Sequence, residues 1–116
     1  MSEFALTKPA IDLLLLEVIG ERPSYGYEIT QTVLSRSGKH FEIKEGALYP
    51  ALHRLERAGL LQAEWGEASG RERKYYRLTA QGKKELVAWR DAWRQFAEAI
   101  EGVLDPNAVS FEGGTL

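Results

Sequence analysis

The stretch from Gly46 to Leu61, GALYPALHRLERAGLL, constrains the fold more than any other part of the sequence. Its residues Leu48, Leu52 and Leu55 recur at steps of four and three, the period of one face of an α-helix, so this face must lie against a core. Gly59 follows the last periodic residue, where a helix often ends in a left-handed cap, and an extended apolar run begins directly after it. The stretch therefore predicts an amphipathic helix that leads directly into a strand.

The opposite side of this predicted helix is basic and rich in hydrogen-bond donors. It carries Gly46, Ala47, Pro50, His53, Arg54 and Arg57, with Tyr49 on its flank. Small residues at the start allow a partner to approach the helix N-terminus closely. Pro50 implies that the helix either begins after Glu45 or bends at the proline. This face suits a partner, although a helix inside a small all-α domain, with a merely solvated polar face, would show the same pattern.

Length and composition exclude several kinds of protein. The chain has 116 residues, which fits one domain with an appended element, and it has no cysteine, which excludes disulfides, thiolate metal ligands and cysteine nucleophiles. His40 and His53 lie on separate predicted elements, so we predict no metal site and no cofactor. No nucleophile elbow, phosphate-binding glycine loop or pair of catalytic carboxylates stands at a recognisable spacing, so we predict that the protein is not an enzyme.

The sequence also indicates a cytoplasmic location without a membrane partner. The apolar run from Ile11 to Ile19 contains Asp12 and Glu17 and follows no basic segment, unlike a signal peptide. It is also too short to span a bilayer.

Charge is distributed unevenly along the chain. The net charge is −2, which argues against a general polyanion binder. From Arg71 to Arg77, however, the run RERKYYR has four basic residues and one acidic residue, whereas acidic residues predominate from Glu85 to Asp105. A local basic patch of this kind is compatible with docking on nucleic acid.

Two further helices precede the central one. Pro9 suits a first helical position, and apolar residues at helical spacing predict a helix from there to Gly20, which we interpret as its stop. Ser24 is the predicted N-cap of a second helix that runs to about Ser37. The alternation in Phe41–Ile43 predicts a very short strand before the central helix.

A β-hairpin should follow the central helix. Alternation from Leu61 to Trp65 predicts a half-buried strand with Trp65 on its inner side, and Gly66–Gly70 has the composition of a turn. Arg71–Leu78 predicts the second strand, which holds the basic run. Its cations Arg71, Arg73, Lys74 and Arg77 could lie along phosphates, although alternation prevents all of them from facing one side, and a solvated charged face is the alternative.

The last predicted element is a long amphipathic helix. Thr79 is its expected N-cap, with Gly82 an unhelpful early residue. Apolar residues then follow a heptad seam: Leu86, Trp89, Trp93, Phe96, Ile100 and Val103. A helix this apolar on one side needs a partner, and we predict that these six residues form a dimer interface. Asp105-Pro106 should end the helix.

This order of elements predicts a mainly α fold with a small β-hairpin, namely a winged helix-turn-helix with a long C-terminal dimerisation helix. We place the DNA-binding domain at residues 8–78, the dimerisation helix at 79–105 and a flexible tail at 106–116. In such a fold the central helix enters a major groove about 12 Å wide.

Three motifs resemble one family in particular. SYGYEI at Ser24–Ile29, GALYPALHRLERAGLL at Gly46–Leu61 and RKYYRLTAQG at Arg73–Gly82 are similar to the PadR family of bacterial winged-helix transcriptional regulators, in its compact subgroup with a single terminal helix. The resemblance covers nearly the whole chain from Pro9 to Leu104. It implies a homodimer on a pseudo-palindromic double-stranded DNA operator, usually a repressor relieved by a small aromatic effector.

The resemblance and the basic run together give a set of candidate DNA-binding residues. They are Tyr25, Gly46, Ala47, Tyr49, Pro50, His53, Arg54, Arg71, Arg73 and Lys74. His53 and Arg54 are expected to read base edges, and Tyr49 either contacts a phosphate or packs under the second helix. Glu45 would repel phosphate unless it turns away.

Trp93, with Trp89 and Phe96, is the candidate effector site that the resemblance implies. Two facing indoles across a two-fold axis could hold a planar aromatic or multidrug-type ligand, although aromatic residues at heptad spacing are also typical of a dimer core. The alternative to DNA binding is a winged-helix protein-interaction module that dimerises.

Overall fold

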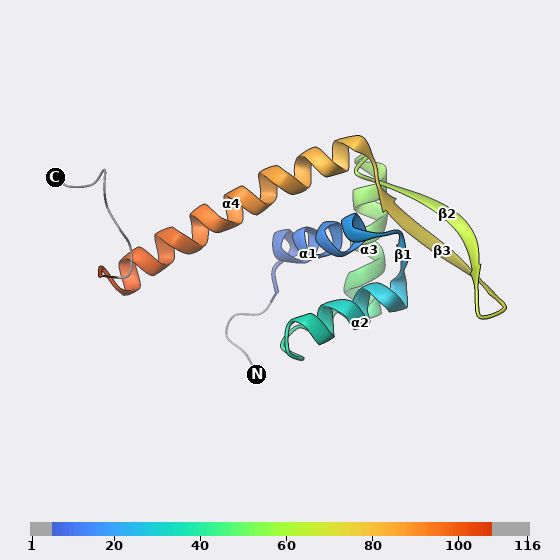
Figure 1. The fold of residues 1–116 in the computed structure, drawn as a ribbon, viewed down its shortest axis with the longest axis horizontal. Coiled ribbons are helices and arrows are strands. Elements are labelled where there is room, and N and C mark those ends of the chain that lie inside the picture. The colour runs from blue at the N-terminus through green and yellow to red at the C-terminus, as the bar shows by residue number, and fades with distance from the viewer. Residues whose placement is uncertain (1–5, 108–116) are drawn as a thin grey trace. The chain divides into compact units, whose positions relative to one another are not determined.

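The computed structural model describes residues 6–107, and in this part of the chain four helices accompany a small three-stranded sheet (Figure 1). In chain order the elements are α1 (Lys8–Glu21), β1 (Ser24–Tyr25), α2 (Gly26–Arg36), α3 (Glu45–Arg57), β2 (Leu61–Ala68), β3 (Arg71–Leu78) and α4 (Ala80–Leu104). The strands are antiparallel in the order β1-β3-β2. The predicted mainly α fold with a hairpin is confirmed, and β1 is an additional strand.

Helix α1 continues past its predicted stop. Thr7 is the N-cap, with its hydroxyl oxygen accepting from the Ala10 N–H, and the helix runs through Gly20 to Glu21. The prediction that Gly20 ends it is wrong, because the glycine serves packing instead. A Cβ there would lie 3.0 Å from Leu78 Cδ1 and 3.3 Å from Leu86 Cδ2.

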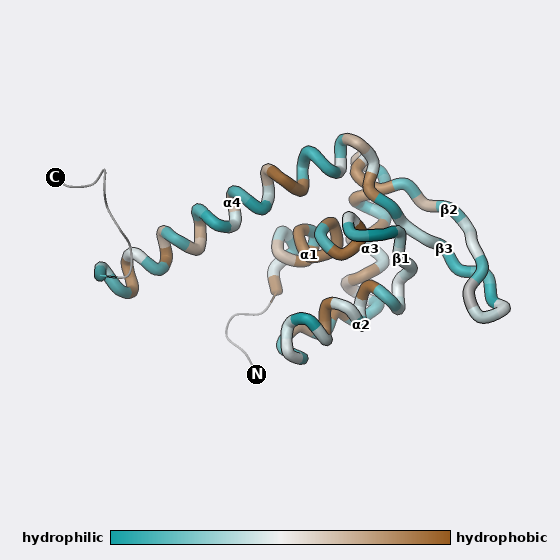
Figure 2. Tube along the Cα trace, in the orientation of Figure 1, coloured by the Kyte–Doolittle hydropathy of each residue, from teal (hydrophilic) through white to brown (hydrophobic). Residues whose placement is uncertain are grey.

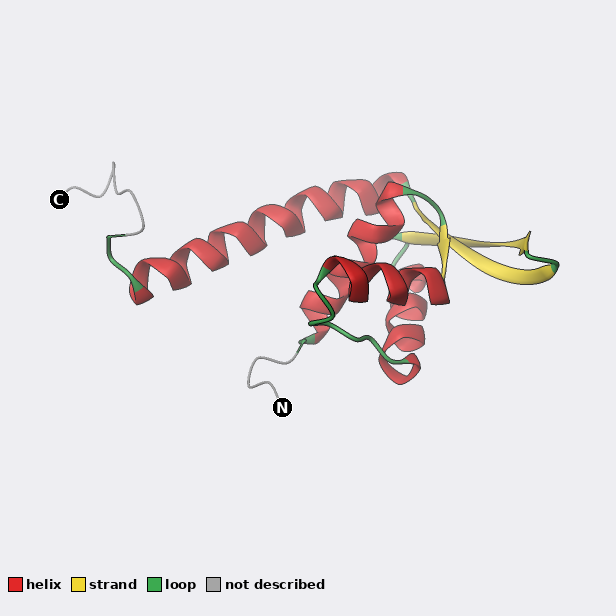
Figure 3. Cartoon of the chain, turned by 60° about the horizontal axis from the view of Figure 1, so that its bottom comes forward, coloured by secondary structure: helices red, strands yellow, loops and turns green. Residues whose placement is uncertain are grey.

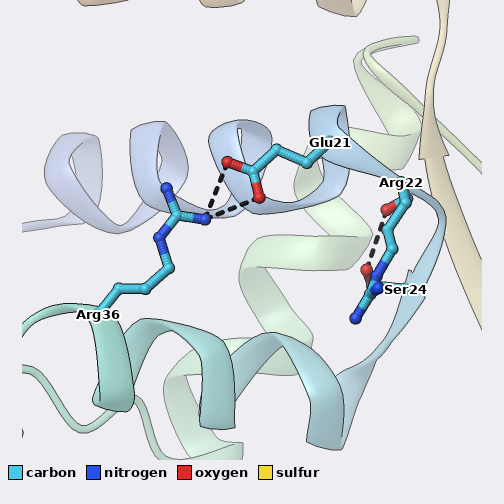
Figure 4. A network of polar contacts seen from close by, with 4 residues as sticks. All are labelled: Glu21, Arg22, Ser24 and Arg36. Atoms are coloured by element: carbon cyan, nitrogen blue, oxygen red, sulfur yellow. Dashed lines mark hydrogen bonds and ion pairs between the residues drawn. The ribbon is translucent and has the colours of Figure 1, made fainter.

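The segment before α2 is a strand, so the prediction that Ser24 is the N-cap is wrong. Ser24 pairs with Tyr76 and Tyr25 with Tyr75 of β3, and Tyr25 itself is the N-cap. The Ser24 hydroxyl donates to the Arg22 carbonyl oxygen at 2.9 Å, as Figure 4 shows. A serine next to a helix start resembles a cap in sequence, but here the strand pairing determines its position.

Helices α1 and α2 are also joined by an ion pair at their surface. Arg36 Nη1 donates to both carboxylate oxygens of Glu21, at 2.7 and 2.8 Å (Figure 4). Both side chains are about half exposed, so this pair contributes little to stability.

Helix α3 begins at Glu45 and continues through Pro50. The predicted strand at Phe41–Ile43 is wrong, since the connection before α3 has no strand pairing. Its alternation has another cause: Ile43 is a buried anchor of that connection, 5% exposed. An apolar side chain between polar ones reports burial, and strand structure additionally needs a neighbouring strand.

The predicted cap after α3 is confirmed. Gly59 has φ +80°, its N–H donates to the Glu56 carbonyl, and the Leu60 N–H donates to the Leu55 carbonyl, both at 3.0 Å. These two bonds are those of a Schellman motif, which needs a left-handed residue at this position.

Strands β2 and β3 form the wing, the long hairpin drawn in yellow in Figure 3. Their register runs from Leu61 opposite Leu78 to Ala68 opposite Arg71. The predicted turn at Gly66–Gly70 is therefore too long, because only Ser69 and Gly70 connect the strands. Both have positive φ, 55° and 74°, as a two-residue turn that follows the twist of the hairpin requires.

Helix α4 starts against the end of α3. The Thr79 hydroxyl accepts from the Gly82 N–H at 2.9 Å, which confirms the predicted cap, and donates to the Gly59 carbonyl at 2.7 Å. A Cβ at Gly82 would lie 2.2 Å from the Leu60 carbonyl oxygen. The glycine thus costs helix propensity but permits this close approach.

By its internal contacts the chain divides into two compact units, Met1–Leu86 and Val87–Leu116. The core of the first unit is mainly apolar, with Ser24 a buried polar residue, and includes Leu15, Leu16, Ile29, Leu48 and Leu52, each at most 1% exposed. In the second unit hydrophobic and hydrophilic segments alternate along α4 (Figure 2). The predicted limits of the DNA-binding domain and dimerisation helix remain predictions, and residues 108–116 of the predicted tail lie outside the described part.

Candidate nucleic-acid interface

The candidate recognition face is the exposed side of α3, and the buried hydrophobic residues of the same helix hold it in place. Leu48, Leu52 and Leu55 are buried, which leaves the opposite side outward. The exposed side contains the candidate residues Gly46, Ala47, Tyr49, Pro50 and His53. Beside it lies a cleft of about 400 Å³ that α3 shares with the start of α2 and the wing, lined among others by Tyr25, Tyr49, His53, Trp65, Arg73 and Lys74.

An aromatic and cationic cluster joins the wing to the start of α2. The Arg73 guanidinium lies 4.7 Å from the centre of the Tyr25 ring, and the Tyr25 and Tyr75 rings meet edge to face at 5.4 Å. Gly66 permits a close approach, because a Cβ there would lie 3.1 Å from the Tyr75 ring. Strand pairing and ring stacking therefore hold Arg73 in a defined position.

Arg73 also has a donor without a partner. Among the atoms of residues 6–107, its Nε is buried and has no hydrogen-bond acceptor. A buried, unsatisfied donor is unfavourable, and an acceptor could reach this one only if the Arg73 side chain moved.

Lys74 lies on the other face of the wing, toward the core. Its ammonium group is 5.6 Å from the centre of the Tyr76 ring, which is 2% exposed. Burial raises the pKa of Tyr76, so its hydroxyl stays neutral. Strand alternation starts the side chains of Lys74 and Arg73 on opposite faces of β3, yet both residues line the cleft. Arg77, one of the predicted wing cations, forms an ion pair with Glu64.

Tyr49 connects the recognition helix to α2. A Cβ at Gly26, the first residue of α2, would lie 2.4 Å from the Tyr49 hydroxyl oxygen, so the ring end rests against that turn. Tyr49 therefore packs against α2, one of the two roles considered for it, and the residue is still 39% exposed. A phosphate contact by the same hydroxyl stays a prediction.

Arg54 does not share the outward direction of His53. Its Nη2 donates to Asp12 Oδ1 of α1 at 2.6 Å, and Asp12 is largely buried. Burial raises the pKa of Asp12, while the nearby cations Arg54 and Lys8 act in the opposite direction. The expected base contact of Arg54 remains a prediction, but in this structure its guanidinium is engaged with α1.

Two large aromatic residues of the cleft are absent from the candidate set. Trp65 and Tyr27 are 66% and 64% exposed and both line the cleft. Trp65 lies on the predicted face of the wing, in step with Leu61 and opposite Lys74, but its predicted burial is wrong, because it stands farther along the hairpin than the buried Leu61 and Tyr76. The exposure of Trp65 could have been predicted from the length of the hairpin, because its outer half extends beyond the residues that pack on the core.

Acidic residues limit the positive charge of the cleft. Glu45 and Glu72 also line it, so Glu45 has not turned away. As the first residue of α3, Glu45 is favourably placed at the helix N-terminus. Such carboxylates reduce the overall attraction of the cleft for phosphate, so that binding depends more on specific contacts.

The effector candidates lie on α4. Trp89 is half-buried, whereas Trp93 and Phe96 are 52% and 58% exposed, with ring centres 5.9 Å apart. Over the described range there is no group of three metal-ligating side chains. Within residues 6–107, none of the helices combines the length and the apolar content that a membrane span needs.

The fold defines a class of protein. Three helices, a short strand after the first helix and a two-stranded wing after the third form a winged helix, in which α3 takes the place of the recognition helix.

Comparison with known proteins then gives the family. Residues 15–88 match the Transcriptional regulator PadR-like family, and the chain belongs to this family of transcriptional regulators, which is not a family of enzymes. It is 37% identical over 102 residues to Transcriptional regulator Rv3488 of Mycobacterium tuberculosis, covering 88% of this chain and 91% of that protein.

Solved structures agree with this assignment. The structure of smu.1704 from Streptococcus mutans UA159 is similar with a TM-score of 0.81 and 36% identity, covering 90% of this chain and 94% of that one. A PadR family transcription regulator from Clostridium difficile R20291 is similar with a TM-score of 0.70 and 34% identity, covering 81% and 97%. The resemblance in the three sequence motifs is thereby confirmed.

Proposed function

We propose that this regulator is a homodimeric repressor that binds a pseudo-palindromic DNA operator. In this proposal α3 of each subunit enters a major groove and the wing contacts adjacent phosphates. The observation that carries it is the cleft between α3 and the wing, in which residues with hydrogen-bonding or cationic groups, His53, Arg73 and Lys74, surround one space.

Arg73 has the features of a phosphate contact. Its guanidinium is held over Tyr25, so little side-chain freedom is lost when it donates to a phosphate. Small residues at the start of α3, Gly46 and Ala47, are both exposed and allow the helix to approach the groove. His53 is the proposed reader of base edges.

The dimer is proposed to form through the seam of α4, Leu86, Trp89, Trp93, Phe96, Ile100 and Val103. Exposure of Trp93, Phe96, Ile100 and Val103 supports this, since large apolar side chains gathered on one helix favour a partner. A planar aromatic effector between facing Trp93 side chains would change the separation of the two recognition helices, which must match about 34 Å of DNA.

The test is selection of binding sites from a random duplex library by the purified protein. Fluorescence anisotropy with the selected duplex and a scrambled duplex would follow at several salt concentrations. We expect competitor-resistant binding with a steep salt dependence, and Arg73→Ala or Lys74→Ala should each make the slope shallower by about one.

Other results separate the parts of the proposal. Equal, weak binding of both duplexes would refute operator recognition and favour the protein-interaction module. An unchanged operator affinity in the presence of saturating planar aromatic compounds, each shown to bind the protein, would remove the effector while leaving the repressor intact.

A further inference from the structure

The ion pair between Arg54 and Asp12 assigns a function to an arginine on the flank of the recognition helix. Arg54 Nη2 and Asp12 Oδ1 are 2.6 Å apart, and these residues are separated by 42 positions in the chain. The pair therefore joins α3 directly to α1, whose Leu15, Leu16 and Ile19 lie in the core.

The burial of the two partners is unequal. The Asp12 side chain is 14% exposed and that of Arg54 is 39% exposed. A carboxylate so far removed from water needs a cation, whereas a half-exposed guanidinium can be solvated on its own. Asp12 thus depends on Arg54 more than Arg54 depends on Asp12.

The helical position of Arg54 explains its direction. It stands three residues after Ala51 and one before Leu55, both of which are buried, so its side chain leaves α3 near the boundary of the core. His53, one residue earlier, is exposed. Neighbouring residues of a helix point about 100° apart, so the two side chains serve different surroundings.

We propose that Arg54 is a positioning residue, which holds α3 on α1 through Asp12 at the orientation that presents His53, rather than a residue that reads bases. This inference rests on the proposed DNA binding. To bind a guanine edge, the Arg54 guanidinium would have to leave Asp12. The largely buried carboxylate would then have lost this partner, and that cost would offset the gain from the base contact.

The test combines five variants with the selected operator, one of which is the conservative Arg54→Lys. Arg54→Ala, Asp12→Asn and the double variant form a cycle, and Arg36→Ala, which breaks the exposed ion pair of α2 with Glu21, is the matched control and should leave operator affinity unchanged. Affinity is measured well below the melting temperature, with circular dichroism to verify that each variant is folded, so loss of fold cannot imitate loss of position.

Positioning predicts one pattern of results. Arg54→Ala and Asp12→Asn should each weaken operator binding by about threefold to tenfold. The double variant should bind the operator no less tightly than the single variant with the lower affinity. Arg54→Lys, which keeps one charged donor for Asp12, should restore most of the affinity. The salt slope and the ratio of affinities for operator and single-base variants should stay unchanged.

Base reading predicts the opposite, and that result would overturn the proposal. Asp12→Asn would then leave affinity unchanged or raise it, since it frees Arg54, and Arg54→Ala would relax specificity at one base pair. Urea unfolding of the same cycle is an arm without DNA. Additive effects on the free energy of unfolding would refute the ion-pair lock, whether or not the protein binds DNA, whereas coupling with no operator binding would refute only the proposed function.

Discussion

The winged-helix unit and the later turns of α4 use apolar residues in different ways. In the first unit Leu15, Leu16 and Leu52 are fully buried, so this unit has its own core. In the second, Phe96 is 58% and Val103 82% exposed. Apolar residues at helical spacing in α3 close a core within one chain, whereas those at heptad spacing in α4 form an exposed surface, which we propose a second chain covers.

Truncation of one apolar residue in each region should show the largest difference between a core within one chain and the proposed interface between two chains. Leu52→Ala removes a fully buried side chain and should lower the free energy of unfolding by about 2–5 kcal/mol at every protein concentration. The matched Ile100→Ala, in a residue 45% exposed, should change the melting temperature only where the dimer is populated. Thermal unfolding over a wide concentration range measures both, and equal effects would abolish the distinction.

Within the first unit, the packing of the start of α4 can be tested at Gly82. Alanine there favours a helix intrinsically, yet its Cβ would meet the Leu60 carbonyl at 2.2 Å. We expect Gly82→Ala to destabilise the protein by about 1–3 kcal/mol by urea unfolding, in spite of a gain of about 1 kcal/mol in helix propensity. The open position Gly46, where a Cβ would contact nothing, provides the control Gly46→Ala. A stabilised Gly82→Ala variant would show that the close approach is not required.

The proposed interface offers a third test. Trp93→Ala removes a large exposed aromatic side chain from the seam and should weaken the dimer by about 1–2 kcal/mol, or roughly tenfold in Kd, with the secondary structure unchanged. Analytical ultracentrifugation measures the change. Val87→Ala, in an exposed residue outside the six seam positions, should leave the Kd as it is. A shift of equal size for both variants would contradict the assigned seam.

The smallest effect concerns pH and remains within the first unit. Burial raises the pKa of Asp12 despite Arg54 and Lys8. Between the ordinary carboxyl pKa and this raised value, the folded protein binds more protons than the unfolded chain, so this group adds stability as the pH falls. Wild type should therefore gain stability relative to Asp12→Asn as the pH is lowered through that interval. Urea unfolding from about pH 7 to about pH 3 checks the sign, and a relative loss would show that the cations outweigh burial.

Much of the fold follows from local sequence. The period of Leu48, Leu52 and Leu55, the cap at Gly59 and the N-cap Thr79 are all as predicted, because each depends on residues within a turn or two of helix. The candidate site is predictable to a lesser degree. His53 is outward as its place on the helix requires, whereas the exposure of Trp65 depends on how far the wing extends beyond the buried Leu61 and Tyr76.

Glycine and serine show why the rest could not be read locally. Gly20 looks like a helix stop and Ser24 like an N-cap, yet Gly20 meets Leu78 and Leu86, and Ser24 pairs with Tyr76. These partners lie more than fifty residues away in the chain. A residue type reports the local conformations that it permits, and the contact that selects among them is tertiary.

The sequence by itself determined the helices, the wing and the basic run, because hydrophobic period, caps and charge are local properties. Tertiary structure alone decided the direction of Arg54, since only the packing of α3 on α1 brings Asp12 within 2.6 Å. It also decided that Arg73 stacks on Tyr25, across a contact between the second helix start and the wing. In both cases the fold determines which group lies next to the cation, and the charge of a side chain does not reveal that neighbour from the sequence.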